Sequence, residues 1–447
     1  MKLDNLITIF LNNFFINDAE EIKVNIGRQS EEIENGTYDR KTRISKTVIL
    51  TKEDMVNFIK KLCRENVEKS TFRIGTKEAE MLINAENIRY YQFHRNQTIF
   101  KVNNPAEKIT YNVANISVEY FMNLLLNDSI TEPSFIYIVR SAFFRIRSRR
   151  DGSIFVDEEE NVLNTSGNNL KYHVIHKIFE NYFVRKYLVL KLKFKNEMSL
   201  DKCKQHFLSY IFNLNLKGIK IRPSENAEDF FNIRNLNVKS YNKLSAELKA
   251  PYKAYSEDLI HLYSNAAWSD NPFTKYIMFY QILERYFTKI PEERMVDFVK
   301  DKFTNPKISF KDNKQVLDLC IAIGEKQKNN KKEQQQLLEV LKHFLSDFNS
   351  IISDLTPDQI HYYQNEVPSF IKSPDHNITF DLTTNNIKDT VVPIAYRIYI
   401  VRNALVHNKG NRDNNYDPTR DYSSLMKEVP LIKSIAEEIM IMDAKQL

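Results

Sequence analysis

The sequence predicts an α+β domain over residues 1–245, followed by an all-α domain over residues 246–447. Three observations support this. The chain has 447 residues, more than a single hydrophobic core usually serves. Apolar residues alternate in several segments of the first half, as strands require, whereas after about residue 245 they recur only at helical spacing. A Lys-, Asn- and Ser-rich run at 237–246 separates the two patterns.

The first half predicts a mixture of strands and helices. Alternating apolar residues favour strands, and a Ser or Thr before an apolar run favours a helix start. The tripeptide Arg150-Asp151-Gly152 is a hairpin signal. The expected elements are a strand over 46–51, a helix from Thr51 to about Arg64, a hairpin joining 135–149 to 153–156, a strand over 187–195, and a helix capped by Ser199 and ending near Asn213.

The second half predicts helices alone. The segments with apolar residues at helical spacing are 256–290, 314–324, 333–352, 393–408 and 423–442. The run 326–336, rich in Lys, Asn and Gln, predicts a solvated loop or an exposed helix end.

Composition excludes several classes of protein. The three cysteines form no C-x-x-C pair, which argues against a disulfide framework or a thiolate zinc site and favours a reducing, cytoplasmic location. Neither a signal peptide nor a membrane-length apolar run is expected, since Asn12 and Asn13 interrupt the first apolar stretch. No Gly-rich phosphate loop or nucleophile elbow occurs, and no cofactor is expected. The net charge of +6 permits an anionic partner without requiring one.

One helix carries the candidate catalytic residues. The segment Arg402-Asn-Ala-Leu-Val-His407 follows Pro393, which suits a first helical turn, and precedes Gly410, which suits a C-terminal cap. Asn403 and His407 are four residues apart and therefore share a face. A similar spacing in Arg89-Tyr-Tyr-Gln-Phe-His94 lacks this context, and we treat it as a chance match.

The same helix has an apolar stripe expected to face a bundle core. Its members are Ile394, Ile398, Val401 and Leu405. The polar side chains of Arg402, Asn403 and His407 lie off this stripe at the helix end. Lys409 and Arg412 follow them, so a phosphate is within reach there.

The segment Arg402–His407 resembles the Arg–Asn–x–x–x–His signature of HEPN domains. Upstream, the segment 271–287 resembles the Tyr–x–x–Leu–Glu–x–x–Phe helix of the Apea-like branch, with Glu284 as its acidic residue. The resemblance covers residues 250–447. It implies a helical bundle that forms a homodimer with paired Arg and His residues at a shared cleft. It also implies endoribonuclease activity on tRNA or mRNA, often in bacterial anti-phage defence (abortive infection) or as a toxin.

The residue types suit metal-independent RNA cleavage. RNA supplies its own nucleophile, the 2′-OH, so the protein need only move protons and stabilise charge. A histidine such as His407 can act as general base or acid near neutral pH, a guanidinium such as Arg402 matches phosphate oxygens, and Asn403 can hydrogen-bond either the phosphate or the imidazole. Because the reaction needs two proton transfers and one histidine does not readily perform both, a second histidine from a partner chain is expected. The expected products are a 2′,3′-cyclic phosphate and a 5′-OH.

Other polar residues have competing interpretations. Glu284 is a supporting or a structural residue, and by the resemblance it lies near Arg402, where a salt bridge can form. Arg285 and Arg397 are expected to be solvated or structural. His173 and His176 are three apart, but no acidic or thiol pair accompanies them, so no metal site is expected.

The basic cluster before residue 150 is a second nucleic-acid candidate. On an expected strand, Arg145, Arg147 and Arg149 share a face with Phe143, which suits single-stranded RNA or a phage product. An exposed face pairing with the acidic run 157–160 is the competing interpretation. We expect residues 1–245 to be a sensing or regulatory domain, with a phage-derived trigger or an antitoxin as partner. The alternatives are a non-catalytic HEPN protein that binds RNA or a partner, and the toxin of a HEPN/nucleotidyltransferase pair.

Overall fold

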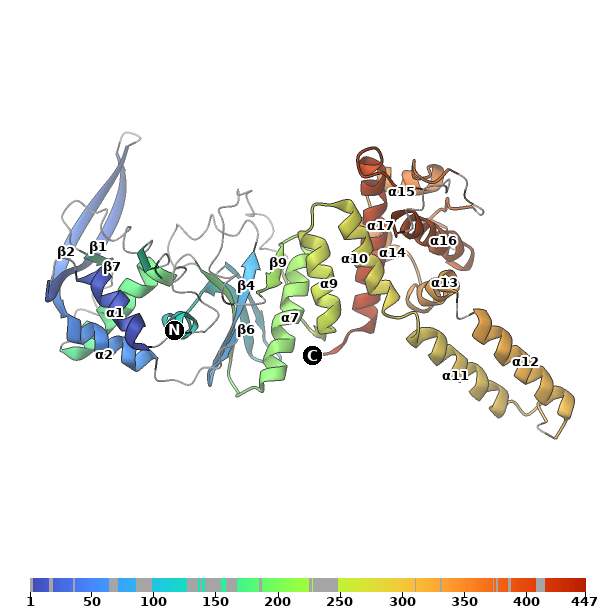
Figure 1. Cartoon of the computed structure of the whole chain (residues 1–447), viewed down its shortest axis with the longest axis horizontal. Coiled ribbons are helices and arrows are strands. Elements are labelled where there is room, and N and C mark those ends of the chain that lie inside the picture. Colours follow the sequence, from blue (N-terminus) through green and yellow to red (C-terminus); the bar gives the residue numbers. More distant parts are fainter. Residues whose placement is uncertain are drawn as a thin grey trace. The chain divides into compact units, whose positions relative to one another are not determined.

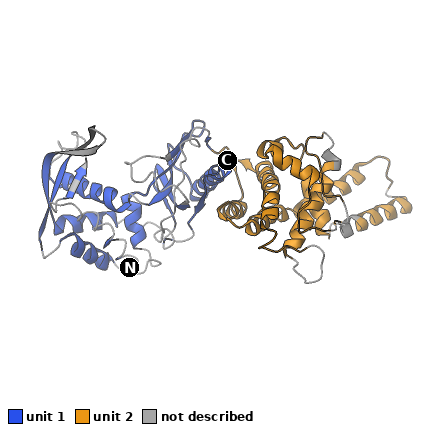
Figure 2. Ribbon diagram, turned by 90° about the horizontal axis from the view of Figure 1, so that it is seen from above, with its two compact units in different colours: residues 1–250 blue, residues 251–447 orange. Residues whose placement is uncertain are grey.

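The computed structural model divides the chain into two compact units, Met1–Ala250 and Pro251–Leu447 (Figure 2). The structure describes residues 3–15, 19–34, 37–63, 71–85, 99–126, 136, 139–140, 154–157, 167–184, 187–224, 227, 248–309, 311–329, 332–372, 374, 377–384, 387–406 and 415–447. The boundary predicted near residue 245 falls outside these ranges.

The described strands of unit 1 form two sheets. In the first, β1 (Glu21–Glu34) pairs antiparallel with β2 (Thr37–Thr51) and parallel with β7 (Ile154–Asp157). The second has the order β3-β4-β8-β6-β5, with β9 also on β4. Its strands are β3 (Phe72–Ile74), β4 (Glu78–Ala85), β5 (Ile99–Asn104), β6 (Ile109–Asn115), β8 (Leu188–Phe194) and β9 (Ile221–Pro223).

The described helices of unit 1 are α1 (Leu3–Phe14), α2 (Lys52–Leu62), α3 (Val118–Leu125), α6 (Asn168–Ile178), the π-helical turn η3 (Phe179–Phe183) and α7 (Leu200–Leu216). Aromatic residues from several of them form much of the core. Phe10, Phe58, Phe179 and Phe183 lie in one buried cluster, and ring centroids of Phe179 and Phe183 are 4.7 Å apart. Apolar burial of this kind is the main stabilising term in folding.

The helix starts predicted at Thr51 and Ser199 and the strand predicted over 187–195 are confirmed. Thr51 ends β2 and caps α2 in a capping box: its hydroxyl accepts from the Asp54 amide, and its own amide donates to the Asp54 carboxylate. The segment 187–195 forms β8, between β4 and β6. Ser199 caps α7 by accepting from the Lys202 amide.

The predicted hairpin around Arg150-Asp151-Gly152 is wrong where it can be tested. Residues 154–157 do form a strand, but β7 pairs in parallel with β1, matching Ile154 with Val24. Ile136, Val139 and Arg140, expected in the first strand, are helical. Val139 is fully buried in the aromatic core, so tertiary packing outweighed the local preference of this segment for a strand. Residues 141–153 lie outside the described ranges.

Unit 2 is rich in helices, as expected. They are α9 (Glu257–Trp268), α10 (Pro272–Glu284), α11 (Lys289–Thr304), α12 (Asn313–Asn329), α13 (Glu333–Phe344), α14 (Asn349–Asp354), α15 (Pro357–Asn365), α16 (Ile387–Val406) and α17 (Tyr422–Asp443) (Figure 1). The helix α10 packs on α9, α16 and α17. Unit 2 also has a short antiparallel ladder, β10 (Lys253–Ala254) with β11 (Lys445–Gln446), so it is not wholly helical.

The start of α16 differs from the prediction. The helix begins at Ile387, so Pro393 lies in its interior and not in its first turn. An interior proline loses a backbone hydrogen bond and clashes with the preceding turn. Thr390 and Val391, before the proline, are buried, so tertiary packing stabilises this part of the helix. Gly410, the expected C-terminal cap, lies outside the described residues.

None of the helices in the described ranges is long and apolar enough to cross a bilayer.

Candidate active site in the helical unit

The apolar stripe of α16 faces the core of unit 2, as predicted. Ile394, Ile398 and Val401 are almost completely buried, and Leu405 is buried. The hydroxyl of Tyr276 on α10 donates to the backbone carbonyl of Ile398 at 3.2 Å. This contact fixes α16 against α10, so the segments 271–287 and 402–407, each singled out by its sequence motif, belong to helices that pack together.

Arg402 projects from α16 towards α10 and α13. Its guanidinium lies over the ring of Tyr280, with 5.3 Å between Cζ and the ring centroid. Nη1 donates to Oδ1 of Asn403 at 3.1 Å, and Nη2 lies 3.2 Å from Oε1 of Glu333. The side chain of Arg402 is 17% exposed. The guanidinium is therefore held in one place and still reaches the surface.

Tyr280 and Glu333 form the other side of this cluster. The Tyr280 hydroxyl donates to Oε1 of Glu333 at 2.7 Å, the same oxygen that faces Arg402. Burial, and next the hydrogen bond to Glu333, raise the pKa of the Tyr280 hydroxyl well above its usual range. The phenol stays protonated and acts as a fixed donor to the carboxylate.

The sequence did not identify Glu333 as part of the site. It lies in the run 326–336, which predicted a solvated loop or an exposed helix end, and it is the first residue of α13. Arg402 pairs with Glu333, whereas Glu284, expected to be either a structural residue or a salt-bridge partner of Arg402, is exposed at the end of α10. The sequence contains no signal for the contact between Arg402 and Glu333, because the two residues are about 70 positions apart along the chain.

Two further arginines of unit 2 have contrasting environments. Arg397 is fully buried and makes a bidentate contact with Glu428, at 2.9 Å from Nε and 2.7 Å from Nη2. Burial alone would lower the pKa of its guanidinium, but Glu428 outweighs burial and raises it. Arg285 is largely exposed and pairs with Asp258 at 3.0 Å. Arg397 therefore has a structural role, tying α16 to α17, and Arg285 belongs to the solvated surface.

Several predicted site residues lie outside the described residues. These are His407, Lys409 and Arg412 after α16, the cluster Arg145, Arg147 and Arg149 in unit 1, and His94 of the second spacing match. Val406, the residue before His407, ends α16 and is exposed.

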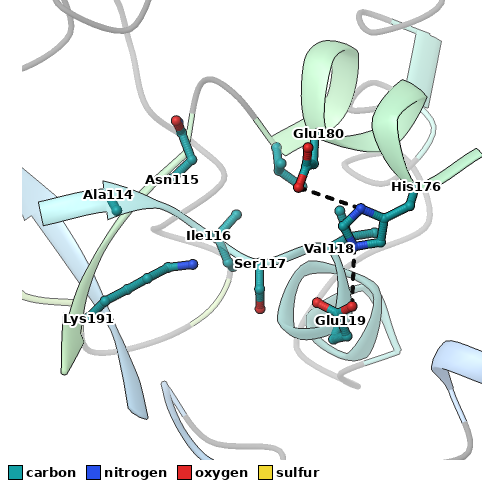
Figure 3. Close-up of a pocket in the computed structure, with 10 residues that line it drawn as sticks. Ala114, Asn115, Ile116, Ser117, Val118, Glu119, His176, Glu180 and Lys191 are labelled. Carbon is teal, nitrogen blue, oxygen red and sulfur yellow. Dashed lines mark hydrogen bonds and ion pairs between the residues drawn. The ribbon is translucent and has the colours of Figure 1, made fainter. Parts of the chain in front are cut away.

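Unit 1 has a cavity of about 430 Å³ beside His176 (Figure 3). Nε2 of His176 lies 3.2 Å from Glu119, and Nδ1 lies 3.5 Å from Glu180. Burial raises the pKa of Glu119, but the hydrogen bond with His176, a backbone hydrogen bond and the nearby charges of His176 and Arg73 together outweigh it, so the net shift is downward. Among the described residues, no group of three or more His, Cys, Asp or Glu side chains is placed to hold a metal ion.

A second charged group lies beside this cavity. The carboxylate of Glu80 is fully buried and accepts from the Ser117 amide at 3.0 Å. Lys191, which lines the cavity, lies 3.3 Å from Glu80, and Arg73 lies 3.6 Å from it. Beside the cavity, the contact of His176 with Glu119 thus joins α6 to α3, and the pair of Lys191 with Glu80 joins β8 to β4, as buried charges require partners.

Comparison of the chain with models of known protein families, with curated proteins and with solved structures found no match.

Proposed function

We propose that unit 2 is a metal-independent endoribonuclease of the HEPN type, with Arg402, Asn403 and His407 as its catalytic residues. The observation that carries the proposal is the contact between Tyr280 and Arg402. These residues belong to the two separate sequence matches, and the fold brings them together. Their contact in one packed cluster supports the proposal.

The proposed reaction is attack of a ribose 2′-OH on the adjacent phosphate. One histidine removes the 2′-OH proton, and a second protonates the leaving 5′ oxygen, which gives a 2′,3′-cyclic phosphate and a 5′-OH. Arg402 binds the phosphate oxygens as negative charge develops on them. Because each chain supplies one His407, a two-fold dimer provides both histidines.

The ion pair of Arg402 with Glu333 bears on this mechanism. A phosphate approaching the guanidinium competes with the carboxylate for the same donors, and Glu333 repels the phosphate. We infer that Glu333 weakens substrate binding while keeping Arg402 in position. If Arg402 stays paired with Glu333 when RNA is present, the alternative is favoured, namely a non-catalytic HEPN protein that binds RNA or another partner.

The wider biological role is part of the same proposal. We infer a cytoplasmic bacterial protein that cleaves tRNA or mRNA in anti-phage defence or as a toxin. Unit 1 then restrains or triggers the nuclease in response to a phage-derived signal or an antitoxin. What supports a regulatory role is that unit 1 is a separate compact body with its own core.

The experiment is cleavage of total bacterial RNA by the purified full chain. Wild type is compared with His407→Ala and with His261→Ala, a matched control because His261 is a half-exposed histidine of α9 in the same unit. Wild type and the control should produce fragments ending in a cyclic phosphate, and His407→Ala should not. RNA that binds the wild-type chain and stays intact would instead identify the non-catalytic alternative.

A further inference from the structure

The cavity beside His176 in unit 1 is large enough for a small molecule. Its volume of about 430 Å³ falls within the roughly 300–1,000 Å³ of small-molecule sites. Residues 114–119, at the end of β6 and the start of α3, line part of it, and the other lining residues are His176, Glu180, Val184 and Lys191. The charged side chains among them are 16–30% exposed, so a solute can reach them from the solvent.

The helix that carries His176 changes its winding beside the cavity. The α-helical pattern of α6 gives way to the π-helical turn η3 at Phe179, one residue before Glu180. Such turns are rare and occur frequently at functional sites. Phe179 and Phe183 of this turn are buried in the aromatic core, whereas Glu180 lines the cavity. The core therefore holds the turn in place, and the turn presents Glu180 to the cavity.

The side of the cavity formed by the sheet has an excess of positive charge. The fully buried carboxylate of Glu80 is a single negative charge, yet Lys191 and Arg73 lie 3.3 Å and 3.6 Å from the same oxygen. Both distances exceed the about 2.7–2.9 Å of a charge-assisted hydrogen bond. Glu78, 3.8 Å from Arg73, lies opposite Lys193 in the register of β4 and β8, so these two charges cancel. Lys191 can therefore hold a second anion inside the cavity.

The side formed by the helices has an excess of negative charge. His176 lies between two carboxylates, 3.2 Å from Glu119 and 3.5 Å from Glu180. Lys177 lies 2.8 Å from Glu180 and offsets one of the two charges. With the imidazole neutral, one negative charge remains, so this side attracts a cation. Figure 3 shows the two sides apart, with Lys191 to the left of Ser117 and the His176 group to its right.

We propose that this cavity binds a small zwitterion, namely a free amino acid or a dipeptide. The carboxylate of the ligand lies beside Lys191, and its ammonium lies beside Glu119 and Glu180. A molecule with one charge would pair with one side and leave the other side without a partner, and a site built for a polar group rejects analogues that lack it. This site goes beyond the proposed nuclease, and its argument uses no residue of unit 2.

The first test is calorimetric titration of the full chain at pH 8. The compounds are the twenty standard amino acids, glycylglycine and alanylalanine. At least one of them should bind with a Kd of about 1 mM or tighter. Its analogue without the ammonium and its analogue without the carboxylate should each bind at least about tenfold more weakly, because each loses one ion pair. The proposal is overturned if no compound binds at about 10 mM, or if both analogues bind as tightly as the parent compound.

The second test assigns each charge of the ligand to one side of the cavity. Lys191→Gln should weaken binding of the zwitterion about tenfold and leave binding of the analogue without a carboxylate unchanged. Glu119→Gln should weaken the zwitterion to a similar degree and leave the analogue without an ammonium unchanged. The controls are Lys195→Gln and Glu197→Gln, at exposed residues after β8 that do not line the cavity, and they should bind every compound as wild type does.

A purely structural role of Lys191 and Glu119 predicts a different result. Their substitution would then weaken binding of every compound alike, and that outcome would overturn the assignment of the two sides. If Glu119→Gln fails to fold, Glu180→Gln replaces it, since Glu180 is 29% exposed and belongs to the same side. The first test needs no variant. RNA cleavage is not a readout, so a failure of the proposed nuclease function leaves both tests decisive.

Discussion

The guanidinium of Arg402 and the phenol of Tyr280 contact the same oxygen of Glu333, and the guanidinium also lies over the Tyr280 ring. Three helices, α10, α13 and α16, therefore meet at one partly exposed cation. Contact with an aromatic face stabilises a cation by about 0.5–2 kcal/mol, depending on its exposure. The cluster holds Arg402 in place before any ligand arrives, and its members are the first targets for substitution.

We expect Arg402→Ala to reduce RNA cleavage at least about 100-fold, the scale of losing a main charge stabiliser. Arg402→Lys should recover little, because an ammonium lacks the planar donors that match two phosphate oxygens. The measurement is the single-turnover rate on a defined RNA. Arg285→Ala is the control, since Arg285 is an exposed arginine in the same unit. Equal activity of Arg402→Ala and the control would remove Arg402 from the mechanism.

Cleavage should persist in EDTA. The proposed reaction uses protein side chains for proton transfer and charge stabilisation, and it requires no metal ion. Rates measured with EDTA and with added Mg²⁺ should agree within a small factor. Loss of activity in EDTA together with recovery in Mg²⁺ would show that the site has been assigned wrongly.

Substitution of Glu333 should separate binding from chemistry. Glu333→Gln keeps an acceptor for the Tyr280 hydroxyl and removes the negative charge beside Arg402. We expect RNA to bind up to about five-fold more tightly, the equivalent of a partly exposed ion pair. Glu339→Gln, on the same helix but paired with Arg294, is the control and should leave affinity unchanged. Weaker binding by Glu333→Gln would mean that the carboxylate helps to position Arg402 and does not compete with the phosphate.

The buried pair of Arg397 and Glu428 predicts a large effect on stability. Glu428→Gln leaves a buried guanidinium without its counter-charge, and such a loss costs about 3–5 kcal/mol. Replacing both residues, with Arg397→Met and Glu428→Leu, should recover much of that loss, because neither charge is then buried. Denaturant unfolding followed by circular dichroism measures both variants. Similar destabilisation by the single and the double substitution would show that packing, and not charge, dominates there.

Stability of unit 1 should fall in acid because of His206. This histidine is fully buried, with Nδ1 2.7 Å from the Tyr111 hydroxyl and Nε2 3.5 Å from Glu107. Burial, and next the charge of Lys202, lower its pKa from 6.5 to about 4. The unfolded chain therefore takes up a proton first as the pH falls. The stabilising contribution is complete above pH 6.5 and is lost as the pH falls towards 4, by up to about 3 kcal/mol.

The measurement is the unfolding free energy of the full chain between pH 7 and pH 4. The pH-dependent loss should be smaller in His206→Gln, which cannot take up a proton. His173→Gln, at a half-buried histidine of α6, is the control. An identical pH dependence in wild type and His206→Gln would contradict the prediction.

Local elements could be predicted because their causes are local. The capping box at Thr51 and the cap at Ser199 each depend on residues within three positions along the chain. The buried stripe of α16 follows from helical periodicity alone. The partner of Arg402 could not be predicted, because Glu333 is brought to it by the packing of α13 on α16.

The sequence by itself determined the change from mixed structure to helices, the principal caps, and the two motif segments. These properties arise from neighbouring residues, so they can be predicted from the order of residues along the chain. Only the tertiary structure decided that Ile154 pairs in parallel with Val24 and that Pro393 lies inside α16. It also decided that Tyr280, Glu333 and Arg402 meet. Each of these outcomes depends on burial and contacts between distant segments, whose free energy outweighs local preference.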